Sequence, residues 1–237
     1  MQDMVTMESV LIKAADILHE HEIQYWVTDG TLLGLIREHR ILPWDSDLDL
    51  GVWKEDVSIP DIIRIFRENG FEYLEVLPDM DSLHFGISGI QLDINLYTEK
   101  SGETSVKWAT NLVRRLDRLS VQAINIIFEG QKNIRVSHAK EINGVGLIKS
   151  LLQGFGRLLT ENFRENIFDY ARSRYVYIGS AYPSELFEFT TFVFKGCELN
   201  VPINSDEYLR LTYGDDWKTP NREYAWETDA CNLKVFD

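Results

Sequence analysis

Apolar side chains recur at two different spacings along the first hundred residues, and each spacing predicts one type of element. Over residues 7–21 the apolar positions are three or four residues apart, which is typical of an amphipathic helix. Over residues 23–28 apolar and polar residues alternate, as in a half-buried strand. Further helices are predicted over 31–38 and 60–69, and further strands over 47–53, 71–77, 83–90 and 92–97. This order predicts an α/β or α+β core with a mixed sheet.

From about residue 105 to residue 173 the apolar spacing lengthens and predicts a helical portion. Four glycines frame an apolar stretch over residues 147–159, which carries Lys149 and Arg157. We interpret it as a packing helix; a surface segment that rests on a membrane is the alternative, and two cations are few for that role. No repeat or Pro-, Gly- or Ser-rich linker divides the sequence. A single domain over 1–237 is expected, with a core at about 20–100 and a helical and closing segment at about 105–220.

Three aspartates stand at alternate positions around the start of the strand predicted over residues 47–53. Successive strand side chains point to opposite faces, so Asp45, Asp47 and Asp49 are expected on one face. Three like charges there repel each other unless a cation lies among them. A small cluster of hard oxygen ligands suits Mg²⁺ or Mn²⁺, which usually completes its shell with water and substrate phosphates. The pattern therefore favours phosphoryl-type transfer as a first hypothesis.

A solvated edge strand is the simpler explanation of alternating acids, because charge on an edge prevents aggregation. Two features argue against it. Leu48, Leu50 and Val52 supply a buried opposite face, and a Gly-Thr turn at residues 30–31 precedes the acids by about one helix length. The amide-rich start of the intervening helix is available to an anion. The turn and the acids are therefore expected to form one site.

Composition favours a soluble enzyme. The 237 residues are 44% hydrophobic, which is enough for a substantial core. The net charge of −14 argues against a nucleic-acid partner, because phosphate backbones are bound by clustered Lys and Arg. With only two cysteines and no signal peptide at the start, a cytoplasmic location is expected. No run of about eighteen apolar residues predicts a membrane-spanning helix.

The motifs together resemble a known family. Gly30-Thr31-Leu32-Leu33-Gly34, Arg37 and Pro43-Trp44-Asp45-x-Asp47-x-Asp49 are similar to motifs of the LicD/fukutin family of phosphotransferases. That family resembles the nucleotidyltransferase superfamily, whose signature is a strand, a Gly-Ser or Gly-Thr turn, a helix and a strand with Asp-x-Asp, joined by an acid from a later strand. The family's closing pattern resembles Phe194-Lys195-Gly196, Val201-Pro202, Tyr208-Leu209 and residues 213–220. The resemblance covers roughly residues 20–220.

The resemblance implies roles for the acidic residues. Asp47 and Asp49 are expected to hold one or two divalent ions that bridge the phosphates of a donor. Asp93 is the best-placed later acid; it either completes a second metal site or accepts the proton of the attacking hydroxyl, and the sequence leaves both roles open. Asp45 matches a position beside the metal pair and is either a third ligand or a support for the ligands. His84, which heads a strand near Asp93, could contact substrate, but a surface or packing role is expected for it.

Four further residues are candidates for binding the donor. Gly30 and Thr31 would offer backbone amides and a hydroxyl to a phosphate, where a small residue permits close approach. Arg37 lies about two helical turns further on and could hold the same phosphate, although an ordinary exposed arginine explains it equally well. Trp44 would stack on a nucleobase, unless it covers the core as loop tryptophans often do. The closing motif at residues 213–220 is expected to have a structural role.

The function implied by the resemblance is transfer of phosphocholine or a polyol phosphate from a CDP-linked donor to a sugar hydroxyl of a cell-surface glycan or glycolipid. The main alternative is a true nucleotidyltransferase, which moves a nucleoside monophosphate, releases pyrophosphate and uses the same carboxylates. A non-catalytic binding protein on the same fold is the third interpretation. Such proteins usually lack one carboxylate, whereas Asp47, Asp49 and Asp93 are all present here.

Overall fold

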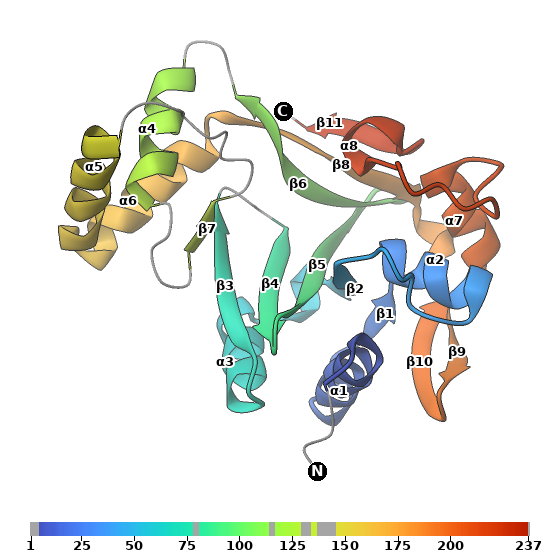
Figure 1. Cartoon of the computed structure of the whole chain (residues 1–237). Coiled ribbons are helices and arrows are strands. Elements are labelled where there is room, and N and C mark those ends of the chain that lie inside the picture. The colour runs from blue at the N-terminus through green and yellow to red at the C-terminus, as the bar shows by residue number, and fades with distance from the viewer. Residues whose placement is uncertain (1–4, 78–80, 114–116, 129–133, 137–145, 237) are drawn as a thin grey trace. The chain divides into compact units, whose positions relative to one another are not determined.

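A computed structural model of the chain describes residues 5–77, 81–113, 117–128, 134–136 and 146–236 (Figure 1). The chain divides into two compact units, and each is described by itself. The first consists of Met1–Tyr73, Asp81–Val106 and Gly179–Lys234; the second consists of Leu74–Met80, Lys107–Ile178 and Val235–Asp237. Every residue predicted to form the site belongs to the first unit. The expectation of one domain over 1–237 stays a prediction.

A mixed sheet forms the centre of the first unit. β5 (Ile90–Lys100) lies between β2 (Asp47–Trp53), which runs parallel to it, and β4 (Ser82–Ile87), which runs antiparallel. β1 (Tyr25–Val27) pairs antiparallel with the other edge of β2. The start of β6 (Glu103–Val113) pairs antiparallel with the end of β5. The sheet continues from β6 through β8 (Tyr175–Pro183) to β11 (Leu233–Phe236).

Three helices accompany the first strands. α1 (Met7–Glu20) begins at a capping box, in which the Thr6 and Ser9 side chains each accept a hydrogen bond from the other residue's N–H. α2 (Asp29–Glu38) follows β1 directly and leads back towards β2. α3 (Ile59–Glu68), preceded by the 3-10 turn Lys54–Asp56, has a proline in its first turn and packs against α1. The apolar faces of these helices and of β2 and β5 form the core.

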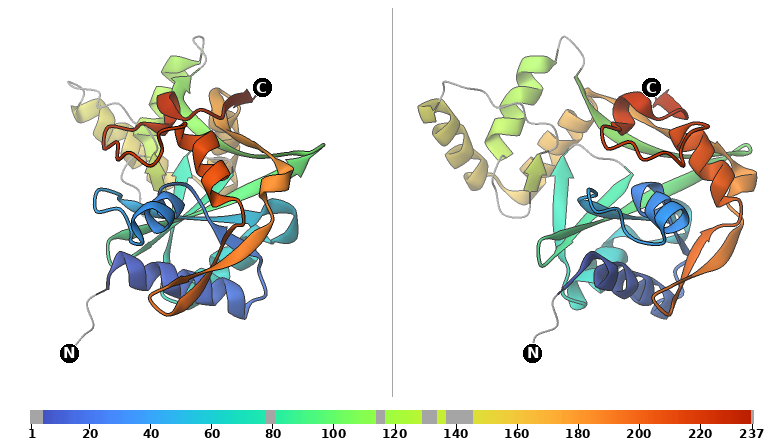
Figure 2. Two further views of the ribbon diagram at one scale, coloured as in Figure 1. Left: turned by 90° about the vertical axis from the view of Figure 1, so that its right-hand side faces the viewer. Right: turned by 45° about the vertical axis from the view of Figure 1, so that its right-hand side comes forward.

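A β-hairpin and two helices form the C-terminal part of the first unit (Figure 2). Lys195 and Gly196 join the hairpin strands, and their φ angles of 50° and 85° are those of a two-residue type I′ turn. α7 packs against α2, so the hairpin and its following helix lie beside the start of the chain. The elements are β9 (Phe189–Phe194), β10 (Cys197–Pro202), α7 (Ser205–Tyr213) and α8 (Trp226–Asp229), preceded by the 3-10 turn Ser184–Leu186.

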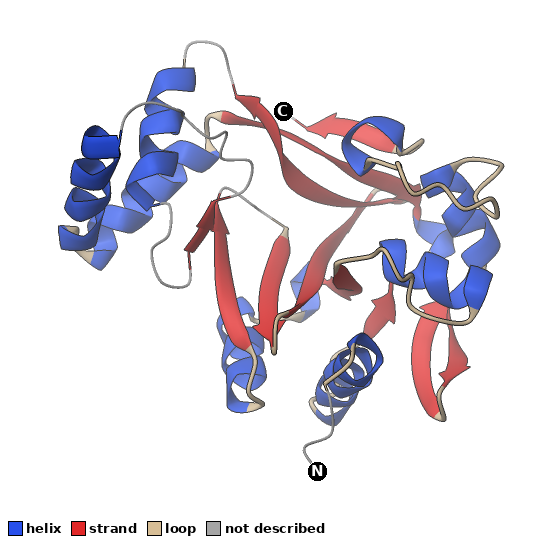
Figure 3. Cartoon of the chain, in the orientation of Figure 1, coloured by secondary structure: helices blue, strands red, loops and turns tan. Residues whose placement is uncertain are grey.

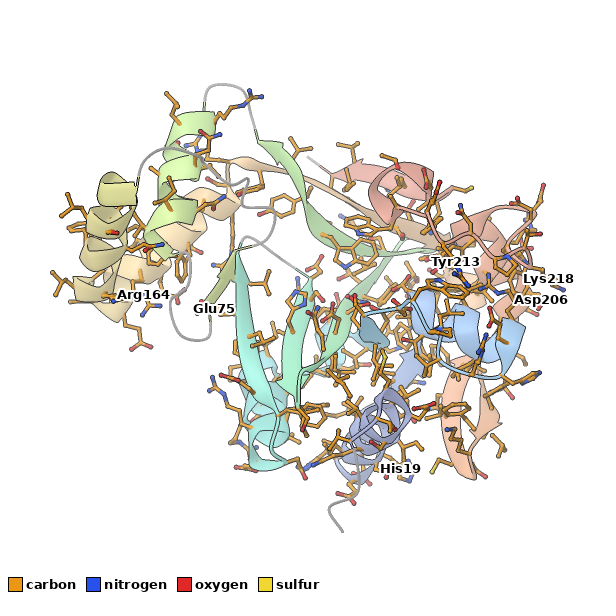
Figure 4. All side chains as sticks on the ribbon, viewed as in Figure 1. His19, Glu75, Arg164, Asp206, Tyr213 and Lys218 are labelled. Carbon is orange, nitrogen blue, oxygen red and sulfur yellow. The ribbon has the colours of Figure 1, made fainter. Side chains whose placement is uncertain are left out.

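The described part of the second unit is mainly helical (Figure 3). Phe128 and Phe168 meet edge to face with ring centroids 4.6 Å apart, and the Arg164 guanidinium lies 5.9 Å from each ring (Figure 4). Ile124 and Ala171 complete this buried cluster. The helices are α4 (Arg118–Phe128), α5 (Gly146–Leu158) and α6 (Glu161–Arg172); a parallel pair of strands, β3 (Glu72–Leu77) and β7 (Ile134–Val136), accompanies them.

The predicted mixed α/β class is confirmed, with helix and strand positions close to those expected through residue 97. The helical interpretation of residues 105–173 is wrong over β6 and β7. β6 is a strand because it pairs with β5, where Ser105 is opposite Thr98, and a cross-strand pairing leaves no trace in helical periodicity. The helical description of the C-terminal portion is also incomplete, because β8, β9, β10 and β11 lie there.

Candidate active site

Two aspartates face each other across the parallel strands β2 and β5. Asp49 is directly opposite Asp93 in the strand register, and Asp47 precedes Asp49 by two residues on the same face. Asp45 lies just before β2, in an irregular segment outside the strand. The structure therefore brings the predicted acids Asp45, Asp47, Asp49 and Asp93 together at the start of β2.

A fifth carboxylate, that of Asp29, joins this group. Asp29 is the first residue of α2 and has a φ of 49°, a left-handed conformation that few residues other than glycine adopt. Its Oδ2 accepts a hydrogen bond of 3.4 Å from Asn95 Nδ2 of β5. Backbone conformations of this kind cluster at functional sites. The sequence interpretation gave Asp29 no role; its position directly before the Gly-Thr turn was the signal that could have identified it.

Burial raises the pKa values of Asp29, Asp45, Asp47 and Asp49, and the negative charges of neighbouring aspartates contribute at Asp29, Asp47 and Asp49. Burial, together with the charges of Asp45 and Asp93, raises the pKa of Asp29 to about 7. Burial also raises the pKa of Asp47 to about 7, with added repulsion from Asp93, Asp45 and Asp29. The pKa of Asp49 lies well above its usual range because of burial and then of the charge of Asp47, and burial raises that of Asp45. This cluster of negative charge is one that a cation would stabilise.

Two hydrogen bonds hold the backbone of Asp49 against the start of α2. The Asp49 N–H donates to Thr31 Oγ1 at 2.8 Å, and the Thr28 N–H donates to the Asp49 carbonyl at 3.2 Å. Thr31 is fully buried. Its hydroxyl therefore positions a catalytic-site strand, and its predicted contact with a phosphate stays a prediction.

Gly30 provides room for another carboxylate. A Cβ atom placed on Gly30 would collide with Oδ2 of Asp45. Close approach of an oxygen anion to this turn was expected, and in the structure the approaching group is the side chain of Asp45. Any larger residue at position 30 would displace Asp45 from the cluster.

Asp93 is held by two neighbours that were not predicted to belong to the site. His84, opposite Asp93 on β4, places its Nδ1 2.9 Å from Asp93 Oδ1 in a hydrogen bond. Gln91 Nε2 donates to both oxygens of Asp93, at 2.9 Å and 3.1 Å. Both His84 and Asp93 are buried. β2 and β4 pair with the two edges of β5, and residues 92–97 are buried throughout.

Arg37 and Trp44 make contacts that differ from the predicted ones. The Arg37 side chain is only 7% exposed, and its guanidinium donates to the Trp217 carbonyl at 3.2 Å and to Glu38 at 2.9 Å. Arg37 therefore connects α2 to the closing motif. The guanidinium of Arg222 lies 4.9 Å from the centre of the Trp44 ring, in a cation–π contact. A phosphate contact for Arg37 and a nucleobase contact for Trp44 stay predictions.

A buried hydroxyl network links the closing segment to the site. The Tyr208 hydroxyl of α7 bonds to Thr28 Oγ1 and, at 3.1 Å, to the Tyr97 hydroxyl of β5. Thr28 Oγ1 also lies 3.0 Å from the Tyr97 hydroxyl. Thr28 directly precedes Asp29, so the network fixes the turn that carries that carboxylate. These contacts connect α7 to the start of α2 and to β5.

The residues present fit a hard divalent cation in their chemistry. The cluster supplies only carboxylate oxygens, the ligands that Mg²⁺ and Mn²⁺ prefer. Across the described residues, no three His, Cys, Asp or Glu side chains already have the arrangement of a metal site. An ion would therefore have to draw the carboxylates together. A groove of about 540 Å³ beside β9, β10 and α7 contains none of these carboxylates, so we assign the site from the aspartates.

The candidate site consists of a strand, a Gly-Thr turn, a helix and a strand with paired carboxylates, which is the order expected of the nucleotidyltransferase superfamily. Residues 22–85 match the family model described as LicD/FKTN/FKRP, nucleotidyltransferase domain. The chain belongs to this family.

Known relatives agree with this assignment. The chain is similar to ribitol-5-phosphate transferase FKTN of Mus musculus, at 33% identity over 231 residues, which are 96% of this chain and 36% of that protein. It is also similar to ribitol 5-phosphate transferase FKRP of Homo sapiens, at 46% identity over 61 residues, which are 23% of this chain and 12% of that protein. An uncharacterized protein of Rickettsia prowazekii is 39% identical over 57 residues, 24% of this chain and 21% of that protein. The chain thus spans about a third or less of these relatives.

One solved structure is partly similar. The crystal structure of ANT(2″)-Ia in complex with adenylyl-2″-tobramycin has a TM-score of 0.34 and 18% sequence identity, and the match covers 41% of this chain and 53% of that chain. Within the described residues, no helix combines the length and the apolar character needed to cross a bilayer.

Proposed function

We propose that the protein transfers a substituted phosphate, and specifically a polyol phosphate, from a CDP-linked donor to a hydroxyl group of a glycan or glycolipid. The observation that carries this proposal is the register of β2 and β5, which sets Asp49 beside Asp93 with Asp47 on the same face. The relative that aligns over 96% of this chain is named a ribitol-5-phosphate transferase, which supports a polyol phosphate as the transferred group.

Each carboxylate has a role in this proposal. Asp45, Asp47, Asp49 and Asp93 would hold Mg²⁺ or Mn²⁺, which when bound would neutralise charge on the donor's phosphates. The hydrogen bond from the Asp49 N–H to Thr31 fixes the strand on which two of these ligands stand. His84 and Gln91 fix the orientation of Asp93. In this proposal the protein contributes acidic ligands rather than a nucleophile of its own.

The reaction is a displacement at phosphorus. The acceptor oxygen forms a bond to the phosphorus that carries the polyol, and the bond from this phosphorus to the oxygen of CMP breaks, with the electron pair leaving on CMP. The hydroxyl proton passes to Asp93 if Asp93 is the base, or to water if Asp93 is a ligand. The hydrogen bonds that His84 and Gln91 make with Asp93 are compatible with Asp93 as the base and with Asp93 as a metal ligand.

A product assay tests the proposal against the nucleotidyltransferase alternative. The protein is incubated with Mg²⁺, a glycan acceptor and in turn CDP-ribitol, CDP-glycerol, CDP-choline or CTP. Release of CMP together with a phosphodiester on the acceptor is the expected result. Pyrophosphate release from CTP would instead identify a true nucleotidyltransferase, which the name of the matched domain also favours. Binding of a donor without turnover would identify a binding protein.

A further inference from the structure

Helix α5 of the second unit carries apolar side chains on its exposed surface. Leu151, Phe155 and Leu158 are 67%, 53% and 83% exposed. Their spacing of four and three residues puts them on one side of the helix, and we call them the α5 stripe. Large apolar side chains gathered on one exposed helix face indicate an interaction surface.

Packing among the described residues does not account for the stripe. α5 packs against α4, and Leu159 after its end contacts the buried cluster of Phe128 and Phe168. The packing interpretation of residues 147–159 therefore holds for the side of α5 that faces α4. The side chains of the α5 stripe are exposed.

Basic and acidic residues are distributed unevenly along the chain, and this distribution indicates what the α5 stripe binds. Residues 107–178 contain twelve Lys and Arg and six Asp and Glu, whereas the rest of the chain contains twelve Lys and Arg and 32 Asp and Glu. The sequence of α5 has Lys149 and Arg157 and no acidic residue, and Arg157 is exposed. Residues 107–178, including α5, therefore carry a net positive charge in a chain whose net charge is −14. An apolar stripe with basic residues on the same helix complements an anionic lipid surface.

We propose that the α5 stripe inserts among the headgroups of an anionic lipid bilayer, with Arg157 attracted to the lipid phosphates. The acidic remainder of the chain is repelled by such a surface, so the charge distribution selects this segment for the contact. A second copy of the chain is a poorer occupant, because a two-fold contact would place two cationic segments together. The inference does not depend on the transferase activity.

Co-sedimentation with lipid vesicles tests this proposal on the 237-residue chain. Binding is expected to vesicles of phosphatidylcholine with phosphatidylglycerol, to be weak on phosphatidylcholine alone, and to decrease with salt. The double variant Phe155→Ser/Leu158→Ser should bind at least roughly tenfold more weakly. Arg157→Gln should weaken binding only to the anionic vesicles.

A matched pair of exposed apolar residues outside the second unit provides the control. Val193 and Ile203 are 67% and 53% exposed, and the double variant Val193→Ser/Ile203→Ser should bind vesicles as the wild type does. Melting temperatures should be similar for both double variants, because all four side chains are exposed. In the wild type, amide exchange in the presence of anionic vesicles should slow in peptides that cover α5.

Three results would overturn the proposal. The first is equal binding to both vesicle types, or none to either. The second is an equal loss of vesicle binding in the stripe variant and the control variant. Slower amide exchange only in peptides outside α5 would have the same meaning. The third is sedimentation of the lipid-free wild type as an oligomer that the stripe variant converts to a monomer, which would make the stripe a contact between copies.

Discussion

Asp49 of β2 and Asp93 of β5 lie opposite each other on neighbouring parallel strands. Strands in a sheet are about 4.8 Å apart, so two carboxylates in this register on one face repel strongly in a partly buried site. The arrangement is tolerable when the acids are protonated or share a cation. This relationship leads to the following expectations.

Metal ions should stabilise the protein. Because a cation relieves the repulsion among the aspartates, millimolar Mg²⁺ or Mn²⁺ should raise the melting temperature, and EDTA should abolish turnover. A thermal melt with and without metal measures the first effect. The double variant Asp47→Asn/Asp49→Asn should show no metal-dependent shift. Full activity in excess chelator would remove the metal from the mechanism.

Replacement of Asp49 should separate activity from stability. Asp49→Asn should lower turnover by at least about a hundredfold, because charge stabilisation by a bound metal supplies several kcal/mol. The metal-free variant should melt at a higher temperature than the wild type, since one repelling charge is removed. Asp56→Asn, at an exposed acid just beyond β2, is the control and should change neither property. A variant that keeps a tenth of wild-type turnover, about 1.4 kcal/mol of barrier, contradicts the assignment.

The stability of the metal-free protein should fall as the pH rises. The pKa values of Asp29 and Asp47 are raised to about 7 in the folded protein, above the value of about 4 expected when unfolded. The folded state therefore binds these protons more tightly, and the stabilisation present at low pH is lost as pH passes through 7. Urea unfolding in EDTA should give a free energy of unfolding that decreases from roughly pH 5 to 8.

The control for this pH dependence is a variant that lacks one of the carboxyl groups whose pKa is raised. Asp47→Asn should flatten the decrease, and saturating Mg²⁺ should reverse its sign for the wild type because the ion binds the ionised form. A free energy of unfolding that rises over this interval in EDTA would be inconsistent with the pKa directions.

Asp93→Asn distinguishes a base from a metal ligand. If Asp93 is the base, the variant should bind Mg²⁺ and donor normally and lose transfer, because an amide cannot accept the proton. If Asp93 is a ligand, metal affinity should fall together with turnover. Calorimetric titration of Mg²⁺ and of a CDP-linked donor, beside the transfer assay, measures both. Wild-type values in all of these measurements would exclude Asp93 from the site.

Gly30→Ala should disrupt the cluster through Asp45. The added Cβ would collide with the Asp45 carboxylate, so turnover and melting temperature should both fall. Gly154→Ala, on an exposed part of α5 where a Cβ meets nothing within 4 Å, should instead raise stability by up to about 1 kcal/mol. Adding Asp45→Ala to Gly30→Ala should restore the melting temperature but not turnover. A Gly30→Ala protein with wild-type turnover would show that Asp45 does not need this space.

The sequence by itself determined the elements that depend on local pattern. The alternation of Leu48, Leu50 and Val52 with the aspartates specified β2 and its buried face, and these residues are buried in the structure. The Gly-Thr turn and the Asp-x-Asp motif identified the site and its family, because both depend on residue types at fixed short spacings.

Tertiary structure decided which residues meet. The opposition of Asp49 and Asp93, the hydrogen bond of His84 to Asp93 and the addition of Asp29 arise from strand pairing and a left-handed turn, which join residues far apart in the chain. The strand identity of residues 103–113 has the same origin, because pairing with β5 outweighs local spacing. Tertiary packing likewise decides which apolar residues of α5 are covered by α4 and which remain exposed. Periodicity reports that a side chain is apolar, and only packing determines what covers it.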